Sequence, residues 1–331
     1  MQGDFKRAWL SGGKGTIKVL MTCSKSFYNA YCNIEKEMVA IGVDFTKVLS
    51  EKPIPMHELV NHVNDIDIYL VAVEKVDRTV IDAAPKLKYI LKHGVGVDNI
   101  DVAYAKEKGI LVTNAPGQNS DAVADMTMAL MLAASRFVTK GDAIVKNNGW
   151  ELLIGHELKN KVLGIMGLGA IGKEVAKRAK GFGMKILVYD VFQNLQYAKE
   201  HNIQYVTKEE LLSKADFISV CMALNDDTKH SINRDFIKMM KPTAYLINTS
   251  RGPIVNEKDL IWALENDVIS GAAIDVYETE PPDKTLVNAK NIITTPHIAG
   301  STFECAERLS KIAVSNIAKF IAGSRPDFIV K

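Results

Sequence analysis

Three ionisable residues in the C-terminal half of the chain have the types and positions needed for one reaction. Arg251, Glu280 and His297 each follow an apolar run typical of a strand, so the three loops that carry them should border one crevice. An arginine presents a planar fork that can hold a carboxylate and polarise an adjacent carbonyl. A histidine can give or take the proton that accompanies a hydride, and a nearby carboxylate would stabilise its imidazolium form.

Each of these residues also has a structural interpretation. Arg251 could form a salt bridge at a strand end, Glu280 could be a solvated loop acid, and His297 could be a loop histidine satisfied by its neighbours. Their coincidence beside a nucleotide-binding motif favours a single site.

That motif is a glycine-rich turn between two apolar runs. Residues 161–190 read as strand, glycine turn, helix, strand and acid. Gly167 allows a sharp turn, Gly169 allows backbone amides to approach a pyrophosphate, and Gly172 allows the helix to pack close to the sheet. The pyrophosphate would lie at the helix N-terminus, against the amides that include those of Ala170 and Ile171. A glycine turn alone is weak evidence, but the flanking strands and the acid 23 positions after Gly167 predict dinucleotide binding.

The acid at the end of the second run is Asp190, which indicates the kind of dinucleotide. A carboxylate there accepts hydrogen bonds from a ribose 2′-hydroxyl but repels a 2′-phosphate. Residues 191–194 supply no Arg or Lys to hold that phosphate. The sequence therefore predicts NAD rather than NADP, with a solvated loop aspartate as the alternative.

Composition excludes several classes of function. The chain has 331 residues, of which 47% are hydrophobic and 24% charged, and its net charge is +2. These values are typical of a soluble protein of two domains without a basic face for nucleic acid or an anionic membrane. The sequence shows neither a stretch long enough for a membrane span nor the apolar core of a signal peptide, which predicts a cytoplasmic protein.

The cysteines lack CxxC or metal-like spacing and are expected to be reduced packing residues; they are Cys23, Cys32, Cys221 and Cys305.

The elements that must position these residues follow from alternating patterns. After an extension at 1–15 that we expect to be loosely ordered, short apolar runs alternate with helical patterns, the first of which covers 27–41. Such alternation predicts a parallel sheet with helices on both faces. The runs are 17–21, 68–73, 89–91 and 110–112 before the glycine turn, and 217–221, 244–249, 271–276 and 292–295 after it.

Two longer helical patterns flank the second half. Residues 120–136 are apolar on more than one face, which fits a helix buried in the core or in a subunit interface, and Trp150 in the irregular segment 147–156 suits the same interface. Residues 304–322 form one amphipathic pattern, which can return to pack on the first domain.

The segment KHGVGVDNID, at 92–101, could approach a ligand closely. Gly94 and Gly96 would let backbone amides form a small nest for a carboxylate, although a tight turn between strand and helix explains the same residues.

Taken together, HGVGVDNID, GLGAIG, INTSRG, AIDVYETEPP and TPHIAGST occur in one order over residues 85–303. In these motifs and their spacing the chain resembles the D-isomer-specific 2-hydroxyacid dehydrogenases, which include phosphoglycerate dehydrogenases and glyoxylate/hydroxypyruvate reductases. The resemblance implies an α/β fold of two doubly wound parallel-sheet domains. A Rossmann NAD-binding domain at 115–302 would be inserted into a flavodoxin-like substrate-binding domain formed by 1–114 and 303–331. It also implies a homodimer through about residues 119–160.

The resemblance assigns roles to individual residues. Arg251 would hold the substrate carboxylate and carbonyl oxygen, His297 would act as acid or base, and Glu280 would tune His297. Asp275 would hydrogen-bond the nicotinamide carboxamide. The implied cofactor contacts are Gly167, Gly169, Ala170, Ile171, Gly172, Asp190, Cys221, Thr249, Asp275 and His297, and the implied substrate contacts are Lys92, Val95, Gly96 and Arg251.

Departures from the family pattern bear on the substrate. Val71 and Ala72 stand where phosphoglycerate dehydrogenases commonly carry an Arg-Ser pair, and Leu152 stands where the dimer arm often carries an Arg. Lys92 is then the only matching cation, although Lys146 of a second subunit's arm could add another. A phosphate needs several donors, so these residues favour a substrate with no charge beyond its carboxylate, such as glycerate, lactate or a longer sugar acid.

The expected function is an NAD-dependent D-2-hydroxyacid dehydrogenase or 2-keto acid reductase. A D-3-phosphoglycerate dehydrogenase of the same family is the alternative substrate assignment. From another class, an NAD(H)-sensing binding protein of the corepressor kind remains open, and turnover of NADH with 2-keto acids separates the two.

Overall fold

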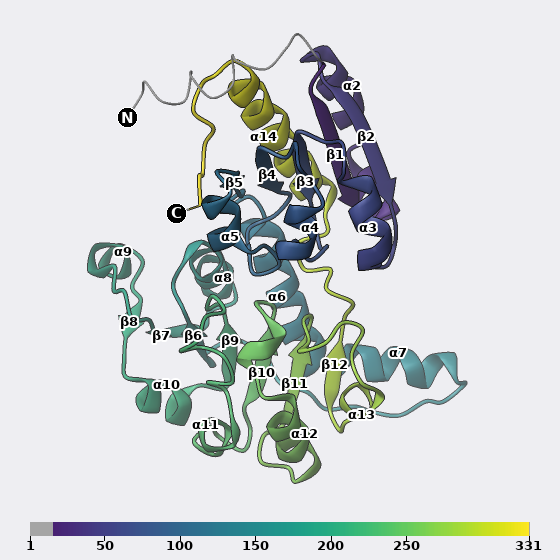
Figure 1. Cartoon of the computed structure of the whole chain (residues 1–331). Helices are drawn as coiled ribbons and strands as arrows, with labels where there is room; N and C mark the ends of the chain where they lie inside the picture. The colour runs from purple at the N-terminus through teal and green to yellow at the C-terminus, as the bar shows by residue number, and fades with distance from the viewer. Residues whose placement is uncertain (1–15, 331) are drawn as a thin grey trace. The chain divides into compact units, whose positions relative to one another are not determined.

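The computed structural model describes residues 16–330, so the extension expected at 1–15 lies outside the described residues. The chain divides into two compact units, which are considered separately (Figure 1). The first unit comprises Met1–Asn119 with Ser301–Lys331, and the second comprises Ser120–Gly300. These bounds differ by a few residues from the domain bounds of 115–302 expected from the sequence.

The first unit is built on a five-stranded parallel sheet in the order β2-β1-β3-β4-β5. This order is the flavodoxin-like one, so that part of the fold prediction is confirmed. The strands are β1 (Lys18–Cys23), β2 (Asp44–Leu49), β3 (Ile68–Val71), β4 (Tyr89–Lys92) and β5 (Leu111–Thr113), and the helices are α1 (Lys25–Ala30), α2 (Ile34–Ala40), α3 (Met56–His62), α4 (Arg78–Asp82), α5 (Val102–Glu107) and α14 (Phe303–Ile321).

Two expectations for this unit are wrong. The helix expected at 27–41 is interrupted, because Tyr31 leaves the helical region (φ −147°, ψ 67°) and separates α1 from α2. All four cysteines carry free thiols, but Cys32 lies in the turn between these helices and is exposed, so it is not a packing residue.

The strand β2 has no counterpart among the expected runs, because this edge strand is only half-buried and its apolar pattern is weak.

Helix α14 returns to the first unit, as its amphipathic pattern predicts. Its N-cap Thr302 accepts a hydrogen bond from the amide of Cys305 at 3.1 Å. Farther along, Phe320 belongs to the same buried cluster as Val19 of β1, and its ring centroid lies 4.8 Å from that of Tyr89. Burial of such an aromatic side chain stabilises the fold by about 1.5–3 kcal/mol, which ties the end of the chain to the sheet.

The second unit is built on a seven-stranded parallel sheet in the order β12-β11-β10-β9-β6-β7-β8. The chain runs outward from β6 in both directions, so the switch point lies between β6 and β9, where ligands of doubly wound sheets bind. The strands are β6 (Val162–Met166), β7 (Lys185–Tyr189), β8 (Gln204–Tyr205), β9 (Phe217–Val220), β10 (Tyr245–Asn248), β11 (Gly271–Ile274) and β12 (Ile292–Thr294). The helices are α6 (Ser120–Ser135), α7 (Val138–Lys146), α8 (Ala170–Gly181), α9 (Leu195–Glu200), α10 (Lys208–Lys214), α11 (Arg234–Lys238), the 3₁₀ turn η1 (Gly252–Ile254), α12 (Glu257–Glu265) and α13 (Lys284–Val287).

Helix α6 lies in the core of the second unit. Ala124, Met128 and Met131 are buried in one cluster with Leu163 of β6 and Val175 of α8, which explains why α6 is apolar on more than one face. Over residues 16–330, no single helix is both long and apolar enough to cross a membrane. The bent pair α6 and α7, with a 62° angle between them, passes by length and composition only when the two helices are taken together.

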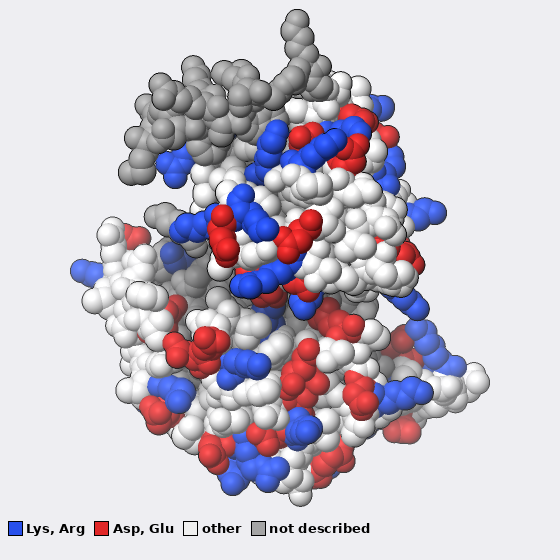
Figure 2. Space-filling view, viewed as in Figure 1, with Lys and Arg blue, Asp and Glu red and all other residues white. Residues whose placement is uncertain are grey.

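Charged residues are mixed on the surface. On the face shown in Figure 2, Lys and Arg are interspersed with Asp and Glu over both units. This agrees with the net charge of +2 and gives that face no extended basic patch.

His93, the residue after β4, is a buried histidine of the first unit and is only 6% exposed. Its Nε2 lies 3.4 Å from the hydroxyl of Ser310, and its ring packs edge-on against Phe27 at 5.4 Å. Burial, together with the charge of Lys92, lowers the pKa of His93 from its ordinary value of 6.5 to about 4.

The folded state therefore keeps His93 neutral where the unfolded chain binds a proton. The free energy of unfolding should fall as the pH drops from about 6.5 to about 4, by about 3 kcal/mol in full, and His93→Gln should remove this component. Urea unfolding of both proteins at about pH 7 and about pH 4.5 measures the difference. His57→Gln, at an exposed histidine, is the control, and equal acid sensitivity in the wild type and His93→Gln would contradict the assignment.

Candidate active site

The glycine turn lies between β6 and α8, as its spacing predicts. Gly167 has φ +97°, and a Cβ there would lie 3.0 Å from the carbonyl oxygen of Cys221. A Cβ at Gly172 would lie 2.2 Å from the carbonyl oxygen of Gly167, so both positions require glycine. By contrast, a Cβ at Gly169 would meet no atom of the described chain within 4 Å. The open face at Gly169, beside the start of α8 at Ala170 and Ile171, fits the close approach of a pyrophosphate.

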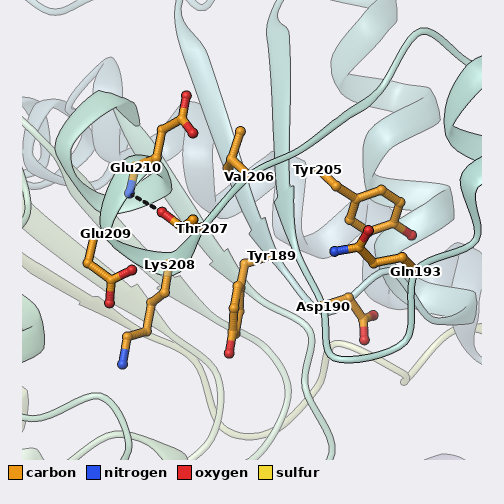
Figure 3. A pocket seen from close by; sticks show the side chains of 9 residues that line it. All are labelled: Tyr189, Asp190, Gln193, Tyr205, Val206, Thr207, Lys208, Glu209 and Glu210. Carbon is orange, nitrogen blue, oxygen red and sulfur yellow. Dashed lines mark hydrogen bonds between the residues drawn. The ribbon is translucent and has the colours of Figure 1, made fainter.

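Asp190 lies beside this turn and holds it. Its Oδ2 accepts a hydrogen bond from the amide of Leu168 at 2.6 Å, and its Oδ1 accepts one from the amide of Phe192 at 2.9 Å. The carboxylate also lines a cavity of about 590 Å³ (Figure 3). The residues around it are Tyr189, Asp190, Gln193, Tyr205, Val206, Thr207, Lys208, Glu209 and Glu210.

A positively charged side chain that the sequence did not place near Asp190 lines this cavity. Residues 191–194 supply none, but Lys208 at the start of α10 lines the same cavity. Glu209 and Glu210 lie beside it, so the acidic residues around the cavity still outnumber the basic one. That balance disfavours a 2′-phosphate.

The loop after β10 presents Arg251. The side-chain amide of Asn248 donates to the carbonyl oxygen of Arg251 at 3.0 Å, and its oxygen accepts from the amide and the hydroxyl of Ser250. Arg251 Nη1 donates to the carbonyl oxygen of Ser250 at 2.7 Å. The next residue, Gly252, packs so closely that a Cβ there would lie 1.9 Å from the carbonyl carbon of Tyr277. The buried Asn248 thus folds the loop, and Gly252 holds it against the loop after β11.

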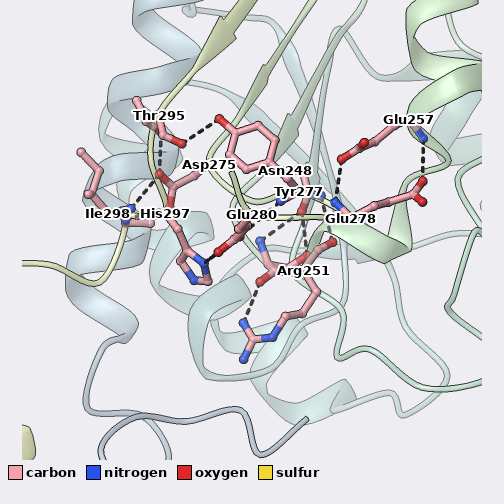
Figure 4. A network of polar contacts seen from close by, with 12 residues as sticks. Asn248, Arg251, Glu257, Asp275, Tyr277, Glu278, Glu280, Thr295, His297 and Ile298 are labelled. Atoms are coloured by element: carbon pink, nitrogen blue, oxygen red, sulfur yellow. Dashed lines mark hydrogen bonds and ion pairs between the residues drawn. The ribbon is translucent and has the colours of Figure 1, made fainter. Parts of the chain in front are cut away.

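His297 and Glu280 form a direct pair (Figure 4). The Nδ1 atom of His297 lies 2.9 Å from each carboxylate oxygen of Glu280. Glu280 also accepts from the amide of Tyr277 at 3.4 Å, and the hydroxyl of Tyr277 donates to the carbonyl oxygen of Thr295 at 2.8 Å. His297 has φ +53°, an uncommon conformation for a residue with a side chain. With Nδ1 on the carboxylate, Nε2 is the ring atom left to exchange a proton with a ligand.

Asp275 is fully buried at the end of β11 and binds the loop that carries His297. Its Oδ1 accepts from the hydroxyl of Thr295 at 2.5 Å and from the amide of Ile298 at 2.9 Å, and its Oδ2 accepts from the amide of Ala299 at 2.8 Å. These bonds hold both flanks of His297. The expected contact of Asp275 with a nicotinamide stays a prediction.

Two expected cofactor contacts have partners within the second unit. The thiol of Cys221, after β9, lies 3.4 Å from the hydroxyl of Ser219, and burial raises its pKa to about 11, so it stays neutral. The hydroxyl of Thr249 lies 2.8 Å from that of Thr127 on α6. Cys221 lies at the switch point beside Gly167, whereas the hydroxyl of Thr249 is bonded within the core. Their contacts with a cofactor stay predictions.

The remaining expected substrate contacts belong to the first unit. Lys92 Nζ donates to the carbonyl oxygen of Ala72 and to Oδ1 of Asn99, at 2.8 Å for the latter. The carbonyl oxygen of Val95 accepts from the side chain of Asn114 at 2.7 Å. Hydrogen bonds therefore orient Lys92 and the backbone of this loop.

The glycines of this loop do not take the alternating left-handed form of a nest, and contact of the loop with a carboxylate stays a prediction. Such a nest alternates right-handed and left-handed residues, and neither Gly94 nor Gly96 has a positive φ. A Cβ at Gly94 would lie 3.3 Å from Cε of Lys92, so this glycine accommodates the lysine side chain.

Two residues of the site were missed from sequence. Asn248 and Tyr277 position Arg251 and Glu280, yet their side-chain chemistry is unremarkable within a strand end and a loop. The signal that was present is positional, because each lies three residues before an expected catalytic residue, at or just after the carboxyl end of a strand.

The chain is similar to known proteins of one family. The family model for the D-isomer specific 2-hydroxyacid dehydrogenase, NAD binding domain, matches residues 128–299. Glyoxylate reductase of Thermococcus litoralis is 41% identical over 287 residues, which cover 83% of this chain and 87% of the relative. Glyoxylate reductase of Pyrococcus furiosus is 39% identical over 291 residues, which cover 85% and 87%. D-lactate dehydrogenase of Aquifex aeolicus, solved with NAD and lactic acid, superposes with a TM-score of 0.81 at 29% identity, covering 92% of this chain and 96% of that one.

The buried bonds of Asp275 yield a prediction. Asp275→Asn places an NH₂ group against at least one of its donors, which costs about 1–3 kcal/mol and should lower the unfolding temperature by several degrees. Hydrogen exchange at the amides of Ile298 and Ala299 should speed up. Thr295→Val is the matched control, because it removes one donor and leaves both amide bonds. Unchanged protection of the two amides in Asp275→Asn would show that Asp275 does not hold the loop.

Proposed function

The chain belongs to the D-isomer-specific 2-hydroxyacid dehydrogenase family, and from this premise we propose how its residues act and on which substrates. It is an NAD-dependent oxidoreductase of 2-hydroxy acids. We infer that it reduces small 2-keto acids to D-2-hydroxy acids, with Arg251, Glu280 and His297 as the catalytic residues. The observation that carries this proposal is the pairing of His297 Nδ1 with the Glu280 carboxylate at 2.9 Å.

In this mechanism His297 moves the proton. Glu280 binds Nδ1 and stabilises the imidazolium, so Nε2 donates to the substrate carbonyl oxygen as it becomes an alkoxide. In the oxidative direction, Nε2 takes the proton back. The chemistry that a bound NAD(H) would add is the transfer of a hydride to or from C4 of its nicotinamide. Glycine-turn residues from Gly167 to Gly172 and Asp190 would hold that dinucleotide.

Arg251 orients the substrate. Its guanidinium presents several donors in one plane, which suits a carboxylate next to a carbonyl. Electron density drawn toward these donors makes C2 of the keto acid a better hydride acceptor. We propose that Lys92, Val95 and Gly96 add further contacts to the substrate, and that Cys221, Thr249 and Asp275 add contacts to the cofactor.

The substrate proposed is a 2-keto or 2-hydroxy acid with no charge beyond its carboxylate. Val71 is fully buried in β3, and Lys92 Nζ is hydrogen-bonded to the neutral acceptors of Ala72 and Asn99. Lys146 is paired with Asp142 at 2.7 Å. Both lysines therefore already have partners, which leaves few donors for a phosphate. The glyoxylate reductases of Thermococcus litoralis and Pyrococcus furiosus favour a small substrate.

We also propose that the chain forms a homodimer through about residues 119–160. Every residue of α7 is exposed or half-buried. In the segment that follows, Trp150, Leu152 and Ile154 are 93%, 87% and 81% exposed. Three large apolar side chains so close together on a surface are typical of an association site.

The acid–base role predicts the effect of removing the imidazole. His297→Ala should lower kcat by about 10²- to 10⁴-fold in the reduction of glyoxylate, while the Kd for NADH stays within about twofold. Stopped-flow turnover and fluorescence titration of NADH measure the two quantities. His57→Ala, at an exposed histidine, is the control. Wild-type turnover in His297→Ala would remove His297 from the mechanism.

The substrate assignment predicts a preference. With NAD as acceptor, kcat/KM for D-glycerate should exceed that for 3-phosphoglycerate by about tenfold or more, because unpaired phosphate charge is costly to desolvate. The same enzyme preparation serves for both substrates, with glyoxylate reduction as the activity reference. An advantage for 3-phosphoglycerate would instead support a phosphoglycerate dehydrogenase. Binding of NADH without turnover of any 2-keto acid would support the regulator alternative.

The homodimer predicts a species of twice 36.5 kDa in sedimentation equilibrium. Ile154→Asp should shift it toward the monomer, because a charge would be buried in an apolar interface. Val39→Asp, at an exposed apolar residue of α2, is the matched control and should remain dimeric. A monomeric wild-type protein would contradict the proposed interface.

A further inference from the structure

Two glutamates outside the proposed catalytic set bind each other's backbone. Glu257 is the first residue of α12, and Glu278 lies in the loop after β11, two residues before Glu280. The amide of Glu257 donates to Oε1 of Glu278 at 3.0 Å, and the amide of Glu278 donates to Oε1 of Glu257 at 2.6 Å. These reciprocal bonds join segments 21 residues apart in the sequence (Figure 4). We refer to Glu257 and Glu278 as the glutamate pair.

The glutamate pair keeps two like charges side by side. Burial raises the pKa of Glu257, and the negative charges of Glu278 and Asp283 act in the same direction. Glu278 also has a histidine neighbour, because Nε2 of His230 lies 3.3 Å from its Oε1. The two atoms do not have the geometry of a hydrogen bond, and Nε2 of His230 has no other hydrogen-bond partner in the described chain. Repulsion between carboxylates opposes this arrangement, so the two amide bonds must compensate for it.

Capping of α12 does not account for the pair. Asn256 already caps this helix, because its side-chain oxygen accepts from the amide of Asp259 at 3.2 Å. The bond from the amide of Glu278 to Glu257, moreover, lies in the loop and satisfies no helix group. What the pair restrains is therefore the loop that leads to Glu280.

That loop contacts the segments that carry the other proposed catalytic residues. Tyr277, next to Glu278, receives the backbone of Gly252 in close contact, donates its amide to Glu280, and donates its hydroxyl to Thr295. The side chain of Glu280 is itself 41% exposed, and its hydrogen bonds within the described chain are to Tyr277 and His297. The direction of the Glu280 side chain thus depends on the conformation of its own backbone.

We propose that Glu257 and Glu278 are positioning residues, which fix the backbone of residues 277–280 so that the carboxylate of Glu280 faces Nδ1 of His297. This inference rests on the proposed roles of Glu280 and His297. It assigns the pair no contact with substrate or cofactor.

The test compares loss of the bonds with loss of the charge. Glu257→Ala and Glu278→Ala should each lower kcat for glyoxylate reduction by about tenfold or more, with the Kd for NADH within about twofold. Glu257→Gln and Glu278→Gln should restore most of kcat, because an amide oxygen still accepts from the backbone. Each single alanine variant removes one of the two reciprocal bonds, and the double alanine variant removes both. The double variant should therefore lower kcat further, but by less than the product of the two single effects, because both bonds restrain the same backbone.

The pH profile separates positioning from mere stability. Glu280→Gln removes the charge that stabilises the imidazolium, so reduction should fall off at a lower pH than in the wild type. Glu278→Ala should move the fall-off in the same direction, with His230, Glu257 and Asp283 as the neighbouring groups that titrate or carry charge. A purely structural effect would lower the activity at every pH and leave the fall-off in place.

Controls make the outcomes distinct. Glu265→Ala, at the other end of α12, removes a carboxylate that accepts from the amide of Lys290 at 2.9 Å, and it should keep kcat. If Glu278→Ala does not fold, Glu278→Asp replaces it, because its shorter side chain does not reach the amide of Glu257.

Two results overturn the proposal. Wild-type kcat and pH profile in both alanine variants, with His297→Ala inactive, would refute the glutamate pair alone. Loss of activity with an unmoved pH profile and no rescue by glutamine would reduce the pair to a structural role. Wild-type turnover in His297→Ala refutes the proposed mechanism itself, and so is distinguished from both.

Discussion

The buried carboxylate of Asp275 is the constraint on which the proposed site depends. A charge without access to water is tolerated only where donors surround it, and here the donors all come from one loop, residues 295–299. The loop must therefore fold back over the end of β11. His297 lies between the residues so bound and takes a left-handed conformation, which the bonds on both sides stabilise against its intrinsic cost.

Close backbone approach supplies the second constraint. Gly252 lies against Tyr277, and Gly172 lies against Gly167, at distances that leave no room for a Cβ. The first contact joins the loop of Arg251 to the loop of Glu280, and the second brings α8 close to its strand. In each case the absence of a side chain lets two segments at the carboxyl ends of parallel strands meet, which is where a doubly wound sheet binds its ligands.

The features that could be predicted from sequence have a local cause. The glycine turn was recognisable because each glycine has a separate steric role at fixed spacing, and α14 because its apolar period matches one helical face. The two doubly wound parallel sheets followed from the alternation of strands and helices and from the family resemblance. The pairing of Glu280 with His297 agrees with the expectation that the loops after these strands lie together.

The features that were missed depend on distant contacts or on weak patterns. Strand β2 is an edge strand and lacks a continuous apolar run, and the break at Tyr31 leaves the apolar period nearly unchanged. Lys208 was missed because it joins Asp190 only in the folded chain. The bonds between Glu257 and Glu278 link two acidic residues that the sequence alone would place on the surface. No sequence pattern connects residues 21 positions apart.

Asp190 shows why the role of a residue can be predicted only in part from its position in the sequence. Its sequence position predicts a ribose contact, and each of its oxygens keeps a second lone pair for such a bond. The structure adds that the same oxygens already bind the amides of Leu168 and Phe192, so the carboxylate also shapes the glycine turn. Substitution of Asp190 would therefore alter both the turn proposed to bind the pyrophosphate and the charge proposed to face the ribose. In the proposed site, cofactor choice and cofactor affinity are therefore linked through this side chain, and Lys208 is the separate position at which the charge of the cavity alone can be changed.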